Sequence, residues 1–220
     1  MWHKVSPTAF RIGYIKSWRS IGYYDKKQYS RGAADNVLIR ETLMRELKGH
    51  PIGNCFITHS DNNTIAVTLY TSRVAIVLGN NDENLERYTK LLSKKFPLYT
   101  FKIEVKEIKK PELSAAVVAD SIARQIEKKM PYRRVIKNAM TKSMEKGAEG
   151  IKVILWGRLN GAEIARRESY KEWNIPTQKI RSDIDYAIER AETLAGTIGL
   201  KVWIYKGDVF KQKNRTQKEA

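Results

Sequence analysis

The sequence contains very little cysteine, no long apolar run and comparatively few acidic residues. Its single cysteine, Cys55, excludes an internal disulfide and a thiolate metal site within the chain. No stretch approaches the roughly eighteen consecutive apolar residues that a membrane-spanning helix needs. The first residues lack the apolar segment of a secretion signal. We therefore expect a cytoplasmic protein without a membrane partner, a bound metal or a cofactor.

Positive charge is what the chain has in excess. Across 220 residues, 41 lysines and arginines stand against 24 acidic residues, which gives a formal net charge of +17. The cations gather in residues 1–31, 124–146 and 206–220, and aromatic side chains lie beside them in two of these stretches. This mixture fits an RNA strand with exposed bases better than a membrane surface, although solvated charge is the alternative. In the first stretch we expect RNA contacts from Lys4, Arg11, Trp18, Arg19, Lys26 and Lys27.

The first half of the chain changes character near residue 35. We interpret residues 1–34 as a basic, aromatic arm that becomes ordered on a partner. A helix is predicted from Asp35 or Asn36 to about Gly49, because the asparagine and aspartate can cap it and an apolar stripe follows. Two strands of a hairpin are expected at residues 56–57 and 65–69, followed by a short apolar connection at 73–78. A helix at 84–95 and a strand at 101–105 follow.

The loop Gly79-Asn80-Asn81-Asp82 connects two of these segments. With the surrounding helices and strands it resembles the G-x-x-G loop of a KH domain of the prokaryotic type, which would span residues 35–108. In that family the loop amides and the next helix N-terminus approach nucleotide phosphates. Asp82 replaces the second glycine, and it adds both a Cβ and a negative charge. The loop therefore either touches RNA or only connects two helices.

A second domain is predicted for residues 109–207, beginning where Pro111 interrupts regular structure. Two helices, at about 112–129 and from Pro131 to a C-terminal Gly147, precede a series of strands. The strands are expected at residues 151–156, 162–168, 181–189 and 199–206. We predict an α+β domain in which two helices pack on a four-stranded sheet, followed by a basic tail at 208–220.

Three cations share one arc of the second of these helices. At about 100° per residue, Arg133, Arg134 and Lys137 group together, while Ile136 and Met140 face the opposite way. Fixed cations on a rigid helix can hold a phosphate backbone, and the arginines can bind phosphate through two N–H groups. A solvated helix face is the alternative, but few acidic residues are spaced to neutralise the cluster.

A glycine-bounded segment at 157–161 predicts a hairpin turn that presents further arginines. Arg158, Arg166 and Arg167 are candidates for contacts with an RNA backbone. The segment lacks the lysine and hydroxyl residue that end a nucleotide-binding loop.

Asp183 and Asp185 alternate along one predicted strand. We interpret them as ion-pair partners of arginines such as Arg181. With Glu189 they raise the alternative of a metal-dependent nuclease, which requires a close acidic pair beside a basic groove.

A series of longer motifs spans almost the whole chain. They read K-V-S-P-x-x-F-R-I-G at 4–13, Y-R-R-x-x-K from 132, G-A-x-G-I-K-V at 147–153, G-R-L-x-G-A-E-I-A-R at 157–166, R-S-D-I-D-Y at 181–186 and I-G-x-K-V-W-I-Y-K-G at 198–207. In order and spacing the series resembles the bacterial-type small-subunit ribosomal protein of the S-three family.

The resemblance implies a non-enzymatic structural protein on the head of the small ribosomal subunit. It implies binding to small-subunit ribosomal RNA and contact with ribosomal proteins of the S-ten and S-fourteen families. It also implies that the chain lines the channel by which messenger RNA enters, where Arg133, Arg134 and Lys137 are linked to messenger unwinding. The alternative is a free KH-type RNA chaperone or regulator.

Overall fold

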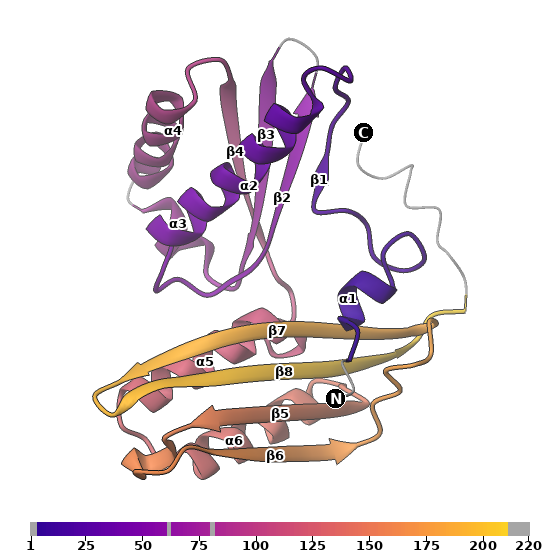
Figure 1. The fold of residues 1–220 in the computed structure, drawn as a ribbon, viewed down its shortest axis with the longest axis vertical. Helices are drawn as coiled ribbons and strands as arrows, with labels where there is room; N and C mark the ends of the chain where they lie inside the picture. The colour runs from indigo at the N-terminus through magenta and orange to yellow at the C-terminus, as the bar shows by residue number, and fades with distance from the viewer. Residues whose placement is uncertain (1–3, 61–62, 80–81, 211–220) are drawn as a thin grey trace. The chain divides into compact units, whose positions relative to one another are not determined.

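The computed structural model describes residues 4–60, 63–79 and 82–210 of the chain. Two compact units are present (Figure 1). One consists of the described parts of Met1–Ser17 and Lys110–Ala220, and the other is Trp18–Lys109. Among the described residues, no helix has the length and apolar character needed to cross a membrane.

The unit Trp18–Lys109 has the KH arrangement of helices packed on a sheet. Its strands follow the order β1-β2-β3-β4, with β2 and β3 antiparallel and the two outer pairs parallel. The strands are β1 (Ser20–Ile21), β2 (Ile52–Ser60), β3 (Thr64–Thr71) and β4 (Thr100–Glu107). The helices are α2 (Tyr29–Glu46), α3 (Val74–Leu78) and α4 (Glu83–Lys95).

The core of this unit follows from strand alternation. Every second residue of β3, namely Ile65, Val67 and Leu69, is buried, because successive side chains of a strand point to opposite faces. They belong to one apolar cluster with Leu43 of α2 and Leu92 of α4. The helices therefore cover one face of the sheet.

The start of α2 differs from the sequence prediction. The helix begins at Tyr29, whereas Asp35 was expected at its N-terminus. The preceding chain packs on the first turns of α2: a Cβ on Gly32 would lie 2.4 Å from the Tyr24 ring, so the glycine makes room for it. The hydroxyl of Tyr24 also accepts a hydrogen bond from Asn36. Residues 18–34 are thus part of the KH unit, and the prediction of a separate arm is wrong there.

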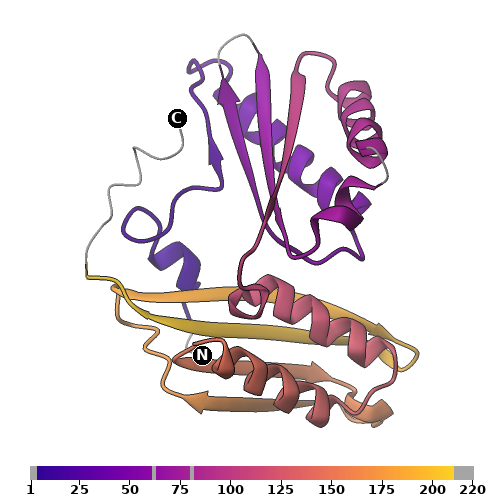
Figure 2. The same cartoon turned by 180° about the vertical axis from the view of Figure 1, so that it is seen from behind.

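The second unit is an antiparallel sheet with two helices on one face (Figure 2), which confirms the predicted α+β architecture. Its strand order is β6-β5-β8-β7. The strands are β5 (Gly150–Gly157), β6 (Arg166–Trp173), β7 (Ser182–Thr193) and β8 (Gly196–Asp208), and the helices are α5 (Ala115–Glu127) and α6 (Tyr132–Glu145). Alternate residues of β5 and β8, such as Val153 and Val202, pack against Ile122 of α5 and Ile136 of α6.

The connection between β5 and β6 is longer than the predicted hairpin turn. It contains a short 3-10 helix, Leu159–Gly161, in which Asn160 has a φ of 55°. As a result β6 begins at Arg166, and the expected strand at 162–168 is displaced toward the C-terminus.

Residues 4–17 also differ from the predicted arm, because they fold with the C-terminal unit. They include the short helix α1 (Pro7–Phe10), which contacts β7 (Figure 1). Pro7 and Arg11 are buried there. The segment is therefore a structural part of this unit.

Candidate nucleic-acid interface

The cations predicted to share one face of a helix do so on α6. Arg133, Arg134 and Lys137 are exposed, whereas Ile136 and Met140 are buried against the sheet. The buried side fixes the helix, so the three cations project from a rigid support. Such a face can bind a phosphate backbone without first becoming ordered.

A carboxylate on the neighbouring sheet holds part of this face in place. Glu168 of β6 accepts hydrogen bonds from the hydroxyls of Tyr132 (2.9 Å) and Tyr170 (2.6 Å). It also lies 3.7 Å from Arg133 Nη2 and 3.3 Å from Arg166 Nε. The Tyr170 hydrogen bond is the largest cause of a lowered pKa for Glu168, and burial with this contact raises the pKa of Tyr170 to about 12.

The Glu168 cluster divides the α6 cations into two kinds. Arg133 is oriented by Glu168 and by a hydrogen bond from its Nε to the Tyr132 hydroxyl at 3.2 Å. For Arg134 and Lys137, no carboxylate in the described part of the chain lies within ion-pair distance. Arg133 is thus oriented by a carboxylate, whereas Arg134 and Lys137 are exposed to solvent.

The three arginines predicted near the β5–β6 connection have different surroundings. Arg158 donates from Nε to the carbonyl of Ala162 (3.0 Å) and from Nη1 to the carbonyl of Ala195 (3.1 Å), so it fastens two loops together. Arg166 is engaged with Glu168, as described above. Arg167 is exposed and pairs across the ladder with Trp156.

The candidates in the N-terminal stretch fall into both units. Trp18, Arg19, Lys26 and Lys27 are exposed on the KH unit, and Lys4 is exposed on the C-terminal unit. Nothing in their positions conflicts with a contact to RNA.

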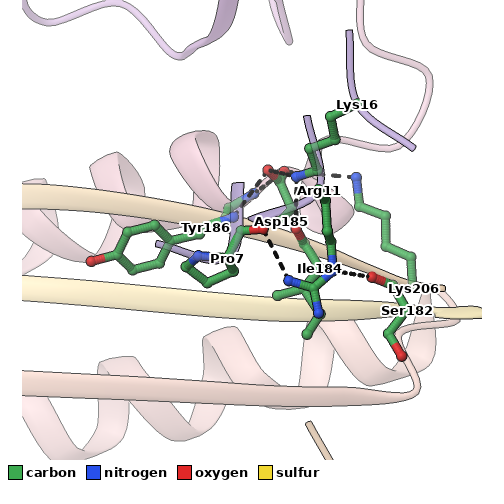
Figure 3. A network of polar contacts seen from close by, with 9 residues as sticks. Pro7, Arg11, Lys16, Ser182, Ile184, Asp185, Tyr186 and Lys206 are labelled. Carbon is green, nitrogen blue, oxygen red and sulfur yellow. Dashed lines mark hydrogen bonds and ion pairs between the residues drawn. The ribbon is translucent and has the colours of Figure 1, made fainter. Parts of the chain in front are cut away.

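Arg11 is the exception among these candidates, because its side chain is fully buried (0% exposed). Nε donates to the carbonyl of Ser182 (2.6 Å) and Nη1 to that of Pro7 (2.9 Å) (Figure 3). Nη2 bonds three more carbonyls, those of Pro176, Thr177 and Lys179. Burial lowers the pKa of the guanidinium, and nearby Asp183 partly offsets this. The predicted RNA contact at Arg11 is corrected to a structural role.

Asp185 is the centre of a second, partly buried polar cluster (Figure 3). Its carboxylate lies 3.5 Å from Lys16 Nζ and 3.7 Å from Lys206 Nζ. It also accepts a hydrogen bond from the backbone N–H of Ala115 (3.0 Å), at the N-terminus of α5, where a negative charge is favourable. Burial alone would raise the pKa of Asp185, but the two lysines and the amide lower it below its ordinary value.

Asp185 therefore has partners other than those predicted, whereas Asp183 lies near an arginine, Arg11. Lysines neutralise Asp185, whereas the Arg181 guanidinium lies 5.9 Å from the centre of the Phe210 ring. Both carboxylate oxygens of Asp185 are occupied by protein groups. Within residues 4–60, 63–79 and 82–210, no group of three or more histidine, cysteine or acidic side chains is placed to hold a metal ion.

The KH loop retains only part of the expected geometry. Gly79 has φ 74° and ψ −167°, a conformation that favours glycine. Asp82 is exposed, adopts the left-handed conformation (φ 60°, ψ 16°) and precedes α4. Glu83 and Glu86 add negative charge in the first turn of that helix, which opposes phosphate binding. Asn80 and Asn81 lie outside the described residues.

Both units match known sequence families. The profile of "Ribosomal protein S3, C-terminal domain" matches residues 122–204, and that of "KH domain" matches residues 38–113. Small ribosomal subunit protein uS3 of Methylococcus capsulatus is 42% identical over 211 residues, covering 96% of this chain and 94% of that protein. The uS3 protein of Vesicomyosocius okutanii is 41% identical over 220 residues, covering 100% and 95%. The chain belongs to the uS3 family of ribosomal proteins.

Membership in the uS3 family confirms the resemblance seen in the sequence motifs. A further relative, uS3 of Borreliella afzelii, is 40% identical over 218 residues, covering 98% of this chain and 75% of that protein. One profile begins within α2 and the other ends within β8, so each unit contains a matched segment.

Sequence reasoning missed the residues that fasten the N-terminal segment of this uS3 chain. These residues are Lys16 and Lys206, which both form ion pairs with Asp185. Lys16 is far from Asp185 in the sequence. The only available signal was the pair of aspartates at 183 and 185, which indicated ion pairing without identifying the partners.

Proposed function

We propose that this uS3 chain is a structural component of the small ribosomal subunit in the cytoplasm. It binds small-subunit ribosomal RNA and contacts ribosomal proteins of the S-ten and S-fourteen families. It lines the channel by which messenger RNA enters and contributes to messenger unwinding. The family assignment and the net charge of +17 support the first part, and the α6 face supports the last.

The observation that carries the messenger contact is the arrangement of Arg133, Arg134 and Lys137. Residues three and four positions apart are neighbours on a helix surface, about 5–6 Å between Cβ atoms. That spacing allows adjacent phosphates of one strand to be bound together. Cations that hold one strand of a messenger hairpin oppose its re-pairing while the ribosome advances, and no nucleotide hydrolysis by this chain is required.

The ribosomal assignment is tested by sedimentation. Tagged chain in a cell lysate should be recovered with small subunits at moderate salt. Recovery mainly in the light fractions, bound to other RNA, would instead support a free KH-type chaperone or regulator.

The messenger contact is tested by the triple variant Arg133→Ala, Arg134→Ala and Lys137→Ala. Ribosomes carrying it should translate messengers with stable hairpins several-fold more slowly and unstructured messengers at the normal rate. The matched control is the exposed α4 triplet Lys90→Ala, Lys94→Ala and Lys95→Ala, which removes the same charge. Equal slowing on both kinds of messenger, or the same hairpin defect in the control, would reject the assignment.

A further inference from the structure

The strand register divides the C-terminal sheet into two faces of different composition. Residues paired across a ladder point to the same face. Val153 and Val202 therefore lie on the face covered by α5 and α6, and Lys152, paired with Lys171 and Trp203, lies on the other. That other face, called the open face, includes Lys152, Ile154, Trp156, Arg167, Ser169, Lys171, Trp173, Ile184, Tyr186, Ile188, Arg190, Glu192, Thr197, Gly199, Lys201, Trp203 and Tyr205.

The charges on the open face are positive except at one end of β7, where Glu192, paired with Thr197, follows Arg190 on the same face. Among the described residues of these strand segments, the acidic side chains Glu168, Asp185 and Glu189 alternate onto the helix-covered face. Burial, followed by the charges of Lys4, Lys171 and Arg167, lowers the pKa of Lys152. The cations are thus close enough to repel one another, and Glu192 lies at the end of β7, ten residues beyond the Ser182 end of the strand.

Trp156 lies flat against this face. The indole occupies the space that a side chain at Gly199 would fill, because a Cβ there would lie 2.1 Å from the ring. Trp156 is 37% exposed, and Lys201 Nζ lies 5.0 Å from the centre of its ring. One side of the indole is therefore supported by the sheet, and a cation stands beside it.

A second aromatic group repeats this pairing. Tyr186 and Trp203 have ring centres 5.0 Å apart and a tilt of 35° between their planes, and both are partly exposed. Lys152 Nζ lies 5.6 Å from the centre of the Trp203 indole ring. Planar rings alternating with cations are the composition by which proteins bind single-stranded nucleic acid, since bases stack on the rings and phosphates bind the cations.

Part of the open face is already covered within the same unit. Ile184 belongs to it by register but is fully buried, because Pro7, Arg11 and Lys16 lie over that end of β7 (Figures 1 and 3). The region around Trp156, Arg167 and Lys201 is at the other end of the sheet. The C-terminal residues 211–220 are a poor occupant for it, since they carry four basic residues and one acidic residue.

We propose that the open face binds a single-stranded segment of RNA, with bases stacked on Trp156 and Trp203 and phosphates beside Lys152, Lys171 and Lys201. The proposal rests on the proposed function, because a chain in the small subunit meets ribosomal RNA at such a surface. An acidic protein would complement the cations, but it would leave the exposed indoles without planar partners.

The charge requirement is tested in the full chain with the triple variant Lys152→Gln, Lys171→Gln and Lys201→Gln. Binding to a fluorescein-labelled oligouridine is followed by anisotropy over a range of salt concentrations. Each phosphate contact to a single strand contributes about 0.7 to the slope of log K against log salt, so the slope should fall by about 2. Affinity near 0.1 M salt should fall on the order of 10- to 100-fold.

The matched control is Lys128→Gln, Lys142→Gln and Lys146→Gln, three exposed lysines on or just after α5 and α6. It has the same net charge but should keep the slope of the unaltered chain. Equal losses in both triple variants would show that the charge acts without regard to position, and would overturn the proposal.

The stacking requirement is tested without changing charge. Gly199→Ala displaces the Trp156 indole, and Trp156→Leu removes it. Each should weaken oligouridine binding on the order of tenfold, leave the salt slope unchanged and spare binding to duplex RNA. Thermal melting identifies any variant that has lost its fold, and unchanged affinity in folded variants of both kinds would overturn the stacking.

The occupant in the assembled particle is identified with a photo-crosslinker. The residue p-benzoylphenylalanine replaces Ile188, which is exposed on the open face beside Lys201. In isolated small subunits the adduct should be to ribosomal RNA, and an adduct to a protein would overturn the proposal. If the unaltered chain failed to enter small subunits, the proposed function would be wrong. The oligouridine measurements would still show whether the open face binds single-stranded RNA.

Discussion

Arg11 and Arg133 belong to the same unit and carry the same guanidinium group, but Arg11 is buried and hydrogen-bonded within the fold, whereas Arg133 faces solvent. Arg11 bonds five backbone carbonyls and has no exposed surface, whereas Arg133 is exposed beside one carboxylate. The contrast shows that a net charge counted along a sequence does not equal the charge available to RNA. Charges bonded to buried carbonyls stabilise the fold, and only the remainder can neutralise phosphates.

The largest difference between the two arginines is expected when each is replaced. Arg11→Met leaves several buried carbonyls without donors, so we expect it to lower the free energy of unfolding by about 3–5 kcal/mol. The matched substitution Arg133→Met should change it by less than about 0.5 kcal/mol. Urea unfolding followed by circular dichroism measures both. Similar values for the two variants would show that burial does not separate them.

Asp185 gives the next largest effect. Asp185→Asn removes the negative charge between Lys16 and Lys206 and weakens the cap of α5, so we expect a loss of about 1–3 kcal/mol. Glu86→Gln, which breaks the exposed pair with Lys90, is the control and should cost less than about 0.5 kcal/mol. If the loss at Asp185 were no larger than in the control, the Asp185 cluster would not contribute to the stability of the fold.

The same carboxylate predicts a pH dependence. The pKa of Asp185 is lower in the folded chain than the ordinary value of about 3.9 expected in the unfolded chain. Its contribution to stability is therefore present above about pH 4 and lost as the pH falls through the folded pKa. The urea midpoint should fall less steeply on acidification in Asp185→Asn than in the unaltered chain. Parallel curves would contradict the lowered pKa.

The smallest effect on stability is expected at Asp82, in a loop where acidic residues stand in place of the expected positive charge. Asp82→Gly relieves a left-handed conformation and should stabilise the KH unit by about 0.5–1 kcal/mol. It also removes a negative charge, so binding to ribosomal RNA fragments should strengthen if the loop touches phosphate. Asp82→Asn, which removes only the charge, separates the two causes. Unchanged affinity in both variants would leave the loop a connection between helices.

Local periodicity was enough to predict much of this protein. The apolar side of α6 repeats at helical spacing, so the exposure of Arg134 and Lys137 could be read from the sequence. The strand-like runs at 151–156 and 199–206 predicted β5 and β8, and with the two helices they predicted the α+β layers. These features depend on residues near one another in the chain.

The remainder depended on contacts between distant segments. Arg11 and Ser182 are 171 positions apart, and an arginine that bonds carbonyls has the same sequence signature as one that binds RNA. The start of α2 depended on Tyr24 packing over Gly32, which no capping pattern reveals. The strand β6 was predicted too early, at residues 162–168, and only the register shows that Arg167 lies beside Trp156 and Trp156 over Gly199.

The fastening at Arg11 also orders events during synthesis. Residues 4–17 leave the peptide exit tunnel long before residues 176–184, which supply most of their partners. The intervening KH unit can form in the meantime, because its contacts lie within Trp18–Lys109. Residues 4–17 are therefore made before the residues that hold them, and they can take up their final packing only after the last two strands have been made.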